Sequence, residues 1–258
     1  MTPEPDLQAA LESVAGTPHL LVALDFDGTL APLVGRAEDA RALPASAAAV
    51  RALAGLPGTT TGLVSGRALD SLRLVADPAP ETLLIGSHGA ETWLGPDAAP
   101  LELTEPQAAL LARAVAVVED TAAAHPGTRV EYKPAGVVLH TRTADDDVAA
   151  DAVAATRSGL APLHGLSISE GKRNLEVSVI HADKGQGLAL LREATGATAV
   201  FFAGDDVTDE NALRTLGAGD VGVRIGAGHT AARFLVGTPE DFADVLTELA
   251  RLREDALR

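Results

Sequence analysis

The sequence contains no cysteine. A disulfide framework, a thiolate metal site and a cysteine nucleophile are therefore excluded, and nothing requires an oxidising compartment. No apolar stretch approaches the ~20 residues that a membrane-spanning helix needs. The first residues include Glu4 and Asp6 and show no basic region followed by an apolar run, so we expect no signal peptide. These absences predict a soluble cytoplasmic protein with no membrane partner.

Basic residues are also scarce. The chain has 20 lysines and arginines against 36 aspartates and glutamates, and its formal net charge is −16. A charge of this sign repels polyanions, so we expect no nucleic-acid partner. Only three of the basic residues are lysines, namely Lys133, Lys172 and Lys184. Because arginine takes the place of lysine elsewhere, each of the three is a candidate functional residue, with survival by chance as the alternative.

The chain does have the length and apolar content of a folded core. Its 258 residues are 47% apolar, which suits one large domain or two modest ones. Short apolar segments alternate with helical patterns at both ends, which is typical of a parallel sheet covered on both faces. We predict an α/β fold with a doubly wound, Rossmann-like core of residues 1–94 and 181–258. Its expected strands are 19–24, 60–64, 83–86, 199–203 and 221–225, and its expected helices include 44–54, 68–74, 185–194, 209–216 and a terminal helix from Pro239.

The middle of the chain shows a different order of elements. Helices are expected over residues 106–124 and 145–158, each followed by two strands, 129–133 with 137–142 and then 166–169 with 174–179. The order α-β-β-α-β-β is typical of an antiparallel sheet with helices on one face. Residues 95–180 are therefore predicted to form an inserted α+β cap domain.

Polar residues stand where the predicted parallel strands end. Asp25 and Asp27 follow the first strand, Ser65 and Arg67 follow the second, Asp205, Asp206 and Asp209 follow strand 199–203, and Lys184 begins the helix before it. Ligands of open parallel sheets bind beyond these carboxyl ends. Taken alone, each of these residues could instead form part of a turn, cap a helix or be a solvated surface charge. Together, the carboxylates would repel one another without a divalent cation, and oxygen ligands without histidine or cysteine favour Mg²⁺.

These residue types fit phosphoryl transfer. Mg²⁺ and Lys184 would neutralise phosphate oxygens, Ser65 would donate a hydrogen bond to them, and Asp25 would attack phosphorus. Asp27 would protonate the leaving alcohol and then deprotonate water. The motif order resembles the haloacid dehalogenase-like phosphatases, and the second aspartate argues against a true dehalogenase. The motifs are Asp25-Phe26-Asp27-Gly28-Thr29, Ser65, Lys184 and Gly204-Asp205-Asp206-Val207-Thr208-Asp209.

A finer resemblance is to the trehalose-6-phosphate phosphatase family, over roughly residues 20–230. It rests on Gly86-Ser87-His88-Gly89-Ala90-Glu91, Glu131-Tyr132-Lys133, His140-Thr141-Arg142, Gly171-Lys172 with Glu176, Asp183-Lys184-Gly185 and residues 204–210. The resemblance implies Mg²⁺ as cofactor and a cap that binds a disaccharide through Glu131, Lys133 and Glu176. The chain departs from the family at Val177-Ser178-Val179, where a proline is usual shortly after the Glu176 position, and this bears on sugar selectivity.

The geometry of a strand supports the cap residues independently. Side chains alternate across a strand, so Glu131 and Lys133 share one face, as do His140 and Arg142, while Asn174 and Glu176 alternate with apolar neighbours. A polyol needs such a face of donors and acceptors, and the alternative is a solvated face with cross-strand ion pairs. The expected substrate-binding residues are Arg67, His88, Glu131, Lys133, His140, Arg142, Lys172, Asn174 and Glu176. For His88 the alternative is a packing role.

The sequence thus predicts a Mg²⁺-dependent phosphatase that acts on trehalose 6-phosphate. The expected catalytic residues are Asp25, Asp27, Ser65 and Lys184, and the expected metal ligands are Asp25, Asp27, Asp205 and Asp209. Sucrose phosphate and a glycosyl phosphoglycerate are the alternative substrates. A silent subunit that binds a sugar phosphate is the alternative from another class of protein. The expected partner is a small-molecule sugar phosphate, and a monomer is the default expectation.

Overall fold

The computed structural model describes residues 4–98, 101–171 and 173–258, which fold into two compact units. The smaller unit is Leu101–His181, and the larger is formed by the chain on both sides of it. The α/β core with an inserted α+β cap, expected from the order of elements, is confirmed.

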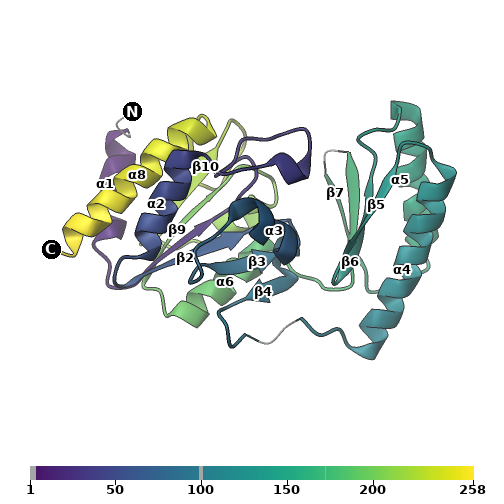
Figure 1. The fold of residues 1–258 in the computed structure, drawn as a ribbon, viewed down its shortest axis with the longest axis horizontal. Helices are drawn as coiled ribbons and strands as arrows, with labels where there is room; N and C mark the ends of the chain where they lie inside the picture. Colours follow the sequence, from purple (N-terminus) through teal and green to yellow (C-terminus); the bar gives the residue numbers. More distant parts are fainter. Residues whose placement is uncertain (1–3, 99–100, 172) are drawn as a thin grey trace. The chain divides into compact units, whose positions relative to one another are not determined.

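The larger unit is built on one mixed sheet (Figure 1). Within the described residues it has seven strands in the order β11-β10-β9-β1-β2-β3-β4, and all neighbours are parallel except β3 and β4. The chain moves outward from β1 in both directions, so the boundary between β1 and β9 is a topological switch point, where ligands of such sheets bind. The strands are β1 (Leu20–Leu24), β2 (Thr59–Val64), β3 (Leu83–Gly86), β4 (Glu91–Trp93), β9 (Ala199–Gly204), β10 (Val221–Ile225) and β11 (Phe234–Val236).

Helices cover both faces of this sheet, as the apolar strands require. On β1, Leu20 and Val22 pack into one core cluster with α1 (Pro5–Ala15), α2 (Pro44–Ala54), α3 (Leu69–Ala76) and α8 (Pro239–Ala256). Leu21 and Ala23 pack into a second cluster with α6 (Lys184–Thr195) and α7 (Asp209–Leu213). Every residue of β1 is buried. The double burial explains why the strand reads as a continuous apolar run.

The smaller unit is an antiparallel sheet with two helices on one face. Its strands lie in the order β5-β6-β8-β7, where β5 is Arg129–Lys133, β6 Gly136–His140, β7 Ser167–Gly171 and β8 Asn174–Ser178. The apolar residues Val137, Leu139, Leu175 and Val177 pack against α4 (Glu105–Ala124) and α5 (Asp146–Leu160). Helix α4 begins with a capping box between Thr104 and Gln107, which satisfies its first backbone donors.

Three details differ from the sequence-based expectations. The helix expected over 209–216 is shorter, since α7 ends at Leu213. Strands β4 and β11 were not predicted, because each has three residues and a strand this short leaves no periodic signal.

In the part of the chain that the structure describes, none of the helices combines the length and apolar character needed to cross a membrane.

Candidate active site

The candidate site lies where β1, β2 and β9 end at the same edge of the sheet. Leu24 of β1 is in register with Ala203 of β9 and with Leu63 of β2, so the loops that follow the three strands are neighbours. The amide of Asp25 donates to the carbonyl of Ala203, which fixes the first residue after β1 against β9. This places Asp25 at the switch point of the sheet.

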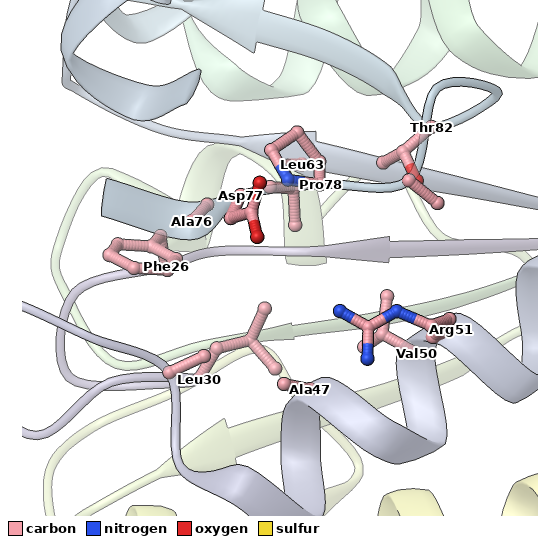
Figure 2. A pocket seen from close by; sticks show the side chains of 12 residues that line it. Phe26, Leu30, Ala47, Val50, Arg51, Leu63, Ala76, Asp77, Pro78 and Thr82 are labelled. Carbon is pink, nitrogen blue, oxygen red and sulfur yellow. The ribbon is translucent and has the colours of Figure 1, made fainter. Parts of the chain in front are cut away.

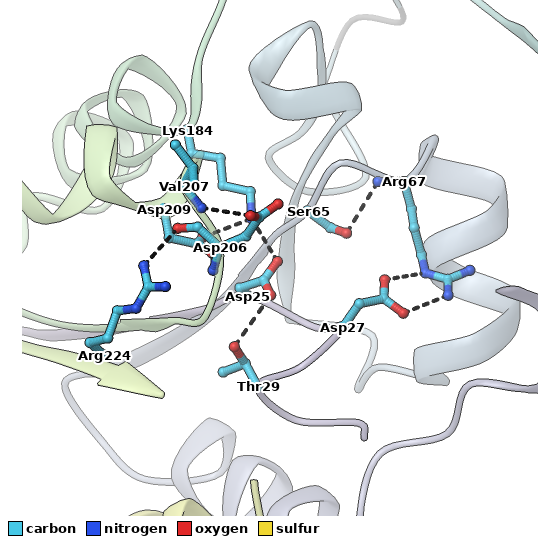
Figure 3. A network of polar contacts seen from close by, with 10 residues as sticks. All are labelled: Asp25, Asp27, Thr29, Ser65, Arg67, Lys184, Asp206, Val207, Asp209 and Arg224. Carbon is cyan, nitrogen blue, oxygen red and sulfur yellow. Dashed lines mark hydrogen bonds and ion pairs between the residues drawn. The ribbon is translucent and has the colours of Figure 1, made fainter. Parts of the chain in front are cut away.

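Lys184 connects two of the predicted site aspartates (Figure 3). Its Nζ atom lies 2.7 Å from Oδ1 of Asp25 and 2.7 Å from Oδ1 of Asp209. Lys184 is the first residue of α6, and the N-cap Asp183 fixes that helix start by accepting a hydrogen bond from the amide of Gln186. Burial acts to lower the pKa of Lys184, but the charges of Asp209 and Asp25 outweigh it and the pKa lies above its usual value. Lys184 is therefore a fixed positive charge between two carboxylates.

Three carboxylates gather around this lysine. Asp25, Asp205 and Asp209 each offer an oxygen, and among the described residues these atoms lie within 4.8 Å of one another. Burial raises the pKa of Asp25 well above its usual value, opposed by Lys184 and increased by Asp209 and Asp205. Burial and the charge of Asp209 raise the pKa of Asp205 to about 6. One lysine does not balance three carboxylates, and a hard divalent cation such as Mg²⁺ fits this donor set.

Two glycines make the close approach of these carboxylates possible. Gly28 has φ +82°, and a Cβ atom there would lie 2.1 Å from Oδ2 of Asp205. A Cβ atom on Gly204 would lie 2.2 Å from Cγ of Asp209. Neither position tolerates a side chain without moving a candidate metal ligand.

Asp27 lies apart from this group and has a different partner. Its two carboxylate oxygens accept hydrogen bonds from Nε and Nη2 of Arg67, each 2.6 Å long. Phe26 between the two aspartates is buried in the core, with the Arg67 guanidinium 5.7 Å from its ring centroid. The group of three carboxylates described above does not include Asp27, so its expected role as a metal ligand stays a prediction. The expected contact of Arg67 with substrate also stays a prediction.

The cap sheet carries its own set of paired polar groups on one face. Nζ of Lys133 donates to Oε1 of Glu176 over 2.7 Å, and Nε2 of His140 lies 2.6 Å from Oε2 of Glu131. The hydrogen bond with His140 lowers the pKa of Glu131 despite partial burial. The register pairs both Glu131 and Glu176 with Val138, so these residues share a face as the alternation predicts. The ion pair of Lys133 with Glu176 and the hydrogen bond between His140 and Glu131 thus lie on one face of this sheet.

The two pairs just described do not include the other expected cap residues. Asn174 begins β8, and its Oδ1 atom accepts a hydrogen bond from the amide of Gly171. Arg142 follows β6 and is exposed. Lys172 lies outside the described residues. The substrate-binding roles of all three stay predictions.

A family model described as trehalose-phosphatase matches residues 23–232. The match includes every motif from Asp25 to Asp209 and the whole of the smaller unit. The chain belongs to the trehalose-phosphatase family.

Individual relatives agree with this membership. The trehalose-phosphate phosphatase of Mycobacterium avium is 33% identical over 272 residues, covering 97% of this chain and 68% of that protein. The bifunctional trehalose-6-phosphate synthase/phosphatase of Thermoproteus tenax is 32% identical over 237 residues, covering 89% of this chain and 32% of that protein. The chain spans only 19% to 32% of the length of three curated relatives that it matches.

A solved structure shares the fold of both units. The C-terminal domain of the C. albicans trehalose-6-phosphate phosphatase has a TM-score of 0.81 and 20% sequence identity, and the likeness covers 97% of this chain and 98% of that one. At this identity the likeness concerns the fold.

Ser65 directly follows β2 and is buried. Its Oγ atom accepts a hydrogen bond of 3.2 Å from the amide of Arg67, and its own amide donates to the carbonyl of Ile85. Ser65 is thus held between two backbone segments. Its role as a phosphate ligand stays a prediction.

The sequence reasoning gave no role to three residues beside the site, namely Thr29, Glu210 and Arg224. Thr29 is fully buried, and its hydroxyl donates to Oδ2 of Asp25 over 3.3 Å. Nη1 of Arg224 donates to Oε1 of Glu210 and to the carbonyl of Asp206. These bonds connect β10 to the loop that carries Asp205 and Asp206. A signal for Arg224 was present, since an arginine inside the apolar strand β10 needs a buried polar partner.

A separate cavity borders the first motif from within the core (Figure 2). Its volume is about 40 Å³, and it is lined mainly by apolar side chains such as Phe26, Leu30 and Leu63. Asp25, Ser65 and Lys184 do not line it. A pocket for a drug-sized ligand is usually ~300 Å³ or larger, so a disaccharide does not fit here.

Proposed function

We propose that this protein is a Mg²⁺-dependent phosphatase that hydrolyses trehalose 6-phosphate to trehalose and phosphate. The observation that carries the proposal is Lys184 between Asp25 and Asp209, with Asp205 beside them at the switch point of the sheet. Membership of the trehalose-phosphatase family supports the choice of substrate. The cytoplasmic location and the monomeric state expected from the sequence belong to this proposal.

Asp25 is the proposed nucleophile. A carboxylate oxygen of Asp25 forms a bond to phosphorus while the bond between phosphorus and the sugar 6-oxygen breaks, and protonated Asp27 gives its proton to that oxygen. The phosphoryl group then remains on Asp25 as an aspartyl phosphate. Water attacks its phosphorus, Asp27 takes the proton from the water, and phosphate leaves with Asp25 restored.

The other residues of the site orient the reacting groups and neutralise their negative charges. Lys184 balances the charge of Asp25 and of the phosphate oxygens, and Arg67 orients the carboxylate of Asp27 through its two hydrogen bonds. Mg²⁺, when bound, neutralises negative charge on the transferred group. Asp25, Asp205 and Asp209 would hold it. Asp27, also expected as a ligand, is assigned here to proton transfer.

The cap supplies the sugar contacts of this proposal. Glu131, Lys133, His140 and Glu176 present hydrogen-bond donors and acceptors on one face of the cap sheet. A disaccharide offers many hydroxyl groups that can replace the ion pairs as hydrogen-bond partners. Phosphate alone needs no such face, so the cap favours a polyol ester over a small phosphate ester.

The test is phosphate release from trehalose 6-phosphate, sucrose phosphate, a glycosyl phosphoglycerate and an aryl phosphate, with and without Mg²⁺. We expect the highest kcat/KM for trehalose 6-phosphate and no turnover without the metal. Asp25→Asn should abolish turnover, because uncatalysed hydrolysis of phosphate monoesters is extremely slow, while the exposed Asp70→Asn should not. A faster reaction with another ester would reassign the substrate. No release from any ester would favour a silent sugar-phosphate-binding subunit.

A further inference from the structure

The segment after β3 carries backbone strain that the proposed reaction does not by itself explain. Ser87 has φ +46° and His88 has φ +55°, both in the left-handed region that non-glycine residues rarely adopt, and Gly89 follows with φ +115°. Strain of this kind persists only where the surroundings determine the conformation, and it clusters at functional sites. We call residues 87–89 the brace segment.

The brace segment contacts the loop that carries Ser65. The amide of His88 donates to the carbonyl of Ser65 over 3.0 Å, and the amide of Ser87 donates to the carbonyl of Arg67 over 2.7 Å. The imidazole ring of His88 lies against Gly66, where a Cβ atom would be 2.4 Å from Cε1 of the ring. The left-handed conformation of Ser87 sets the angle between these two consecutive peptide groups, and both amides donate to the same loop.

The same segment also contacts the residue before Lys184. A Cβ atom on Gly89 would lie 2.6 Å from the carbonyl oxygen of Asp183, the N-cap of α6. The backbone of Gly89 therefore packs directly on the start of the helix that presents Lys184. The Ser87 hydroxyl, which donates to the buried carboxylate of Glu91, fixes the other side of the segment.

We propose that the brace segment positions Ser65 and Lys184 relative to each other, with His88 and Gly89 as positioning residues. The inference rests on the proposed phosphatase activity, in which both residues face the phosphoryl group. Donors to a transferring phosphoryl group must be placed before it arrives, and a small displacement is expected to cost rate without unfolding the protein. This assignment gives His88 a role in positioning the serine loop.

The contact between Gly66 and His88 allows a direct test. The φ of Gly66 lies outside the left-handed region, so Gly66→Ala adds a methyl group without backbone strain, and its three nearest contacts are all atoms of the His88 ring. We expect Gly66→Ala to lower kcat about 10-fold to 100-fold. In Gly66→Ala/His88→Ala the ring is gone, and kcat should return to that of His88→Ala. A loss in the double variant larger than that of His88→Ala alone, or no loss in Gly66→Ala, would overturn the proposal.

The contact between Gly89 and Asp183 has a matched control in the same chain. Gly95 has φ +119°, close to the +115° of Gly89, but a Cβ atom there would meet nothing within 4 Å. Gly95→Ala therefore adds the same backbone strain without displacing Asp183. We expect Gly89→Ala to lower kcat at least about 10-fold and Gly95→Ala to leave it unchanged. Equal effects of the two substitutions would contradict a role in placing Lys184.

A double-mutant cycle separates positioning from a purely structural role. If His88 acts through Ser65, His88→Ala should lower kcat in the wild type and have little further effect in Ser65→Ala, with the melting temperature unchanged between the two backgrounds. A structural role would lower kcat by the same factor in both backgrounds and would overturn the proposal.

A binding measurement keeps this inference separate from the proposed function. Calorimetric titration with inorganic phosphate in the presence of Mg²⁺ needs no turnover. Phosphate affinity should fall in Gly66→Ala and return to that of His88→Ala in Gly66→Ala/His88→Ala. Failure of the wild type to hydrolyse any ester would reject the phosphatase, whereas unchanged phosphate affinity in Gly66→Ala would reject the positioning role even in an active enzyme.

Discussion

Arg67 donates hydrogen bonds to both carboxylate oxygens of Asp27, from Nε to Oδ2 and from Nη2 to Oδ1, and each is 2.6 Å long. A bidentate contact of this kind fixes both the position and the plane of a carboxylate. A lysine, as a point charge, does not fix the plane. The geometry gives Asp27 one orientation next to Asp25. In the proposed mechanism this restriction orients the carboxylate that takes the proton from water in the second step.

Replacing Arg67 should therefore impair proton transfer more than metal binding. We expect kcat to fall about 10-fold in Arg67→Lys and about 100-fold in Arg67→Ala, within the ~10² to 10⁴ that general acid catalysis contributes. The Mg²⁺ concentration for half-maximal activity should stay unchanged. Arg73→Ala, in the neighbouring helix α3, is the control and should have no effect on kcat. An Arg67→Ala variant with wild-type kcat would remove Arg67 from the mechanism.

The carboxylate group gives the metal-free protein a defined dependence on pH. Burial and the charge of Asp209 raise the pKa of Asp205 to about 6 in the folded state, above the ~3.9 of an unfolded chain. The folded state therefore favours protonated Asp205. This contribution to stability is complete below about pH 4 and is lost as the pH rises through about 6.

Mg²⁺ should reverse that loss, because it binds the deprotonated carboxylates. We expect the increase in melting temperature on adding Mg²⁺ to be larger at about pH 7.5 than at about pH 5. Using the difference between samples with and without Mg²⁺ cancels the titration of carboxylates elsewhere. In Asp205→Asn the increase should shrink at the higher pH. Equal increases at both values would show that the metal does not bind through these carboxylates.

The sequence predicted which residues meet at the candidate site better than it predicted their individual contacts. The strand before Asp25 was visible because both faces of β1 are buried and every residue is apolar. The contact between Arg67 and Asp27 was not, because it joins residues 40 positions apart in loops whose paths no local pattern encodes. Similarly, the alternation placed Lys133 and Glu176 on polar faces, but pairing them needs the strand order β5-β6-β8, which follows from tertiary packing.

A structural prediction concerns Arg253 of α8, which is 1% exposed. Its guanidinium donates to the backbone carbonyls of Ala15, Thr17 and Gly58 and to the Thr59 hydroxyl, at the amino ends of β1 and β2. Arg253→Met would leave several of these acceptors without partners, at a cost of about 2 to 5 kcal/mol in the free energy of unfolding.

The melting temperature of Arg253→Met should accordingly fall by roughly 5 to 15 °C. Below the transition kcat should be unchanged, since the contacts lie at the edge of the sheet opposite to the candidate site. Arg251→Met is the matched control, because Arg251 lies on the same helix and pairs with Glu248 and Asp255 at the surface. Its melting temperature should stay close to that of the wild type, because exposed ion pairs contribute little to stability. A similar loss in both variants would mean that the buried contacts of Arg253 add nothing specific.

The cap prediction separates recognition of the sugar from chemistry on the phosphate. If Glu131, Lys133 and Glu176 bind the disaccharide, their replacement by alanine should lower kcat/KM for trehalose 6-phosphate, because hydrogen bonds that position the substrate are lost. An unpaired buried partner costs about 1 to 3 kcal/mol, which corresponds to a decrease of about 10-fold to 100-fold. An aryl phosphate has no hydroxyl groups for these residues, so its kcat/KM should stay within about 2-fold.

Tyr132→Phe is the control for this comparison. Tyr132 stands between Glu131 and Lys133 in β5, so its side chain lies on the opposite face, where its hydroxyl donates to Glu119. Removing that hydroxyl should change neither substrate's kcat/KM. Equal losses for both substrates in the alanine variants would assign Glu131, Lys133 and Glu176 to the stability of the cap. If kcat/KM falls for neither substrate, the polar face of the cap sheet is solvated surface and the substrate is a smaller phosphate ester.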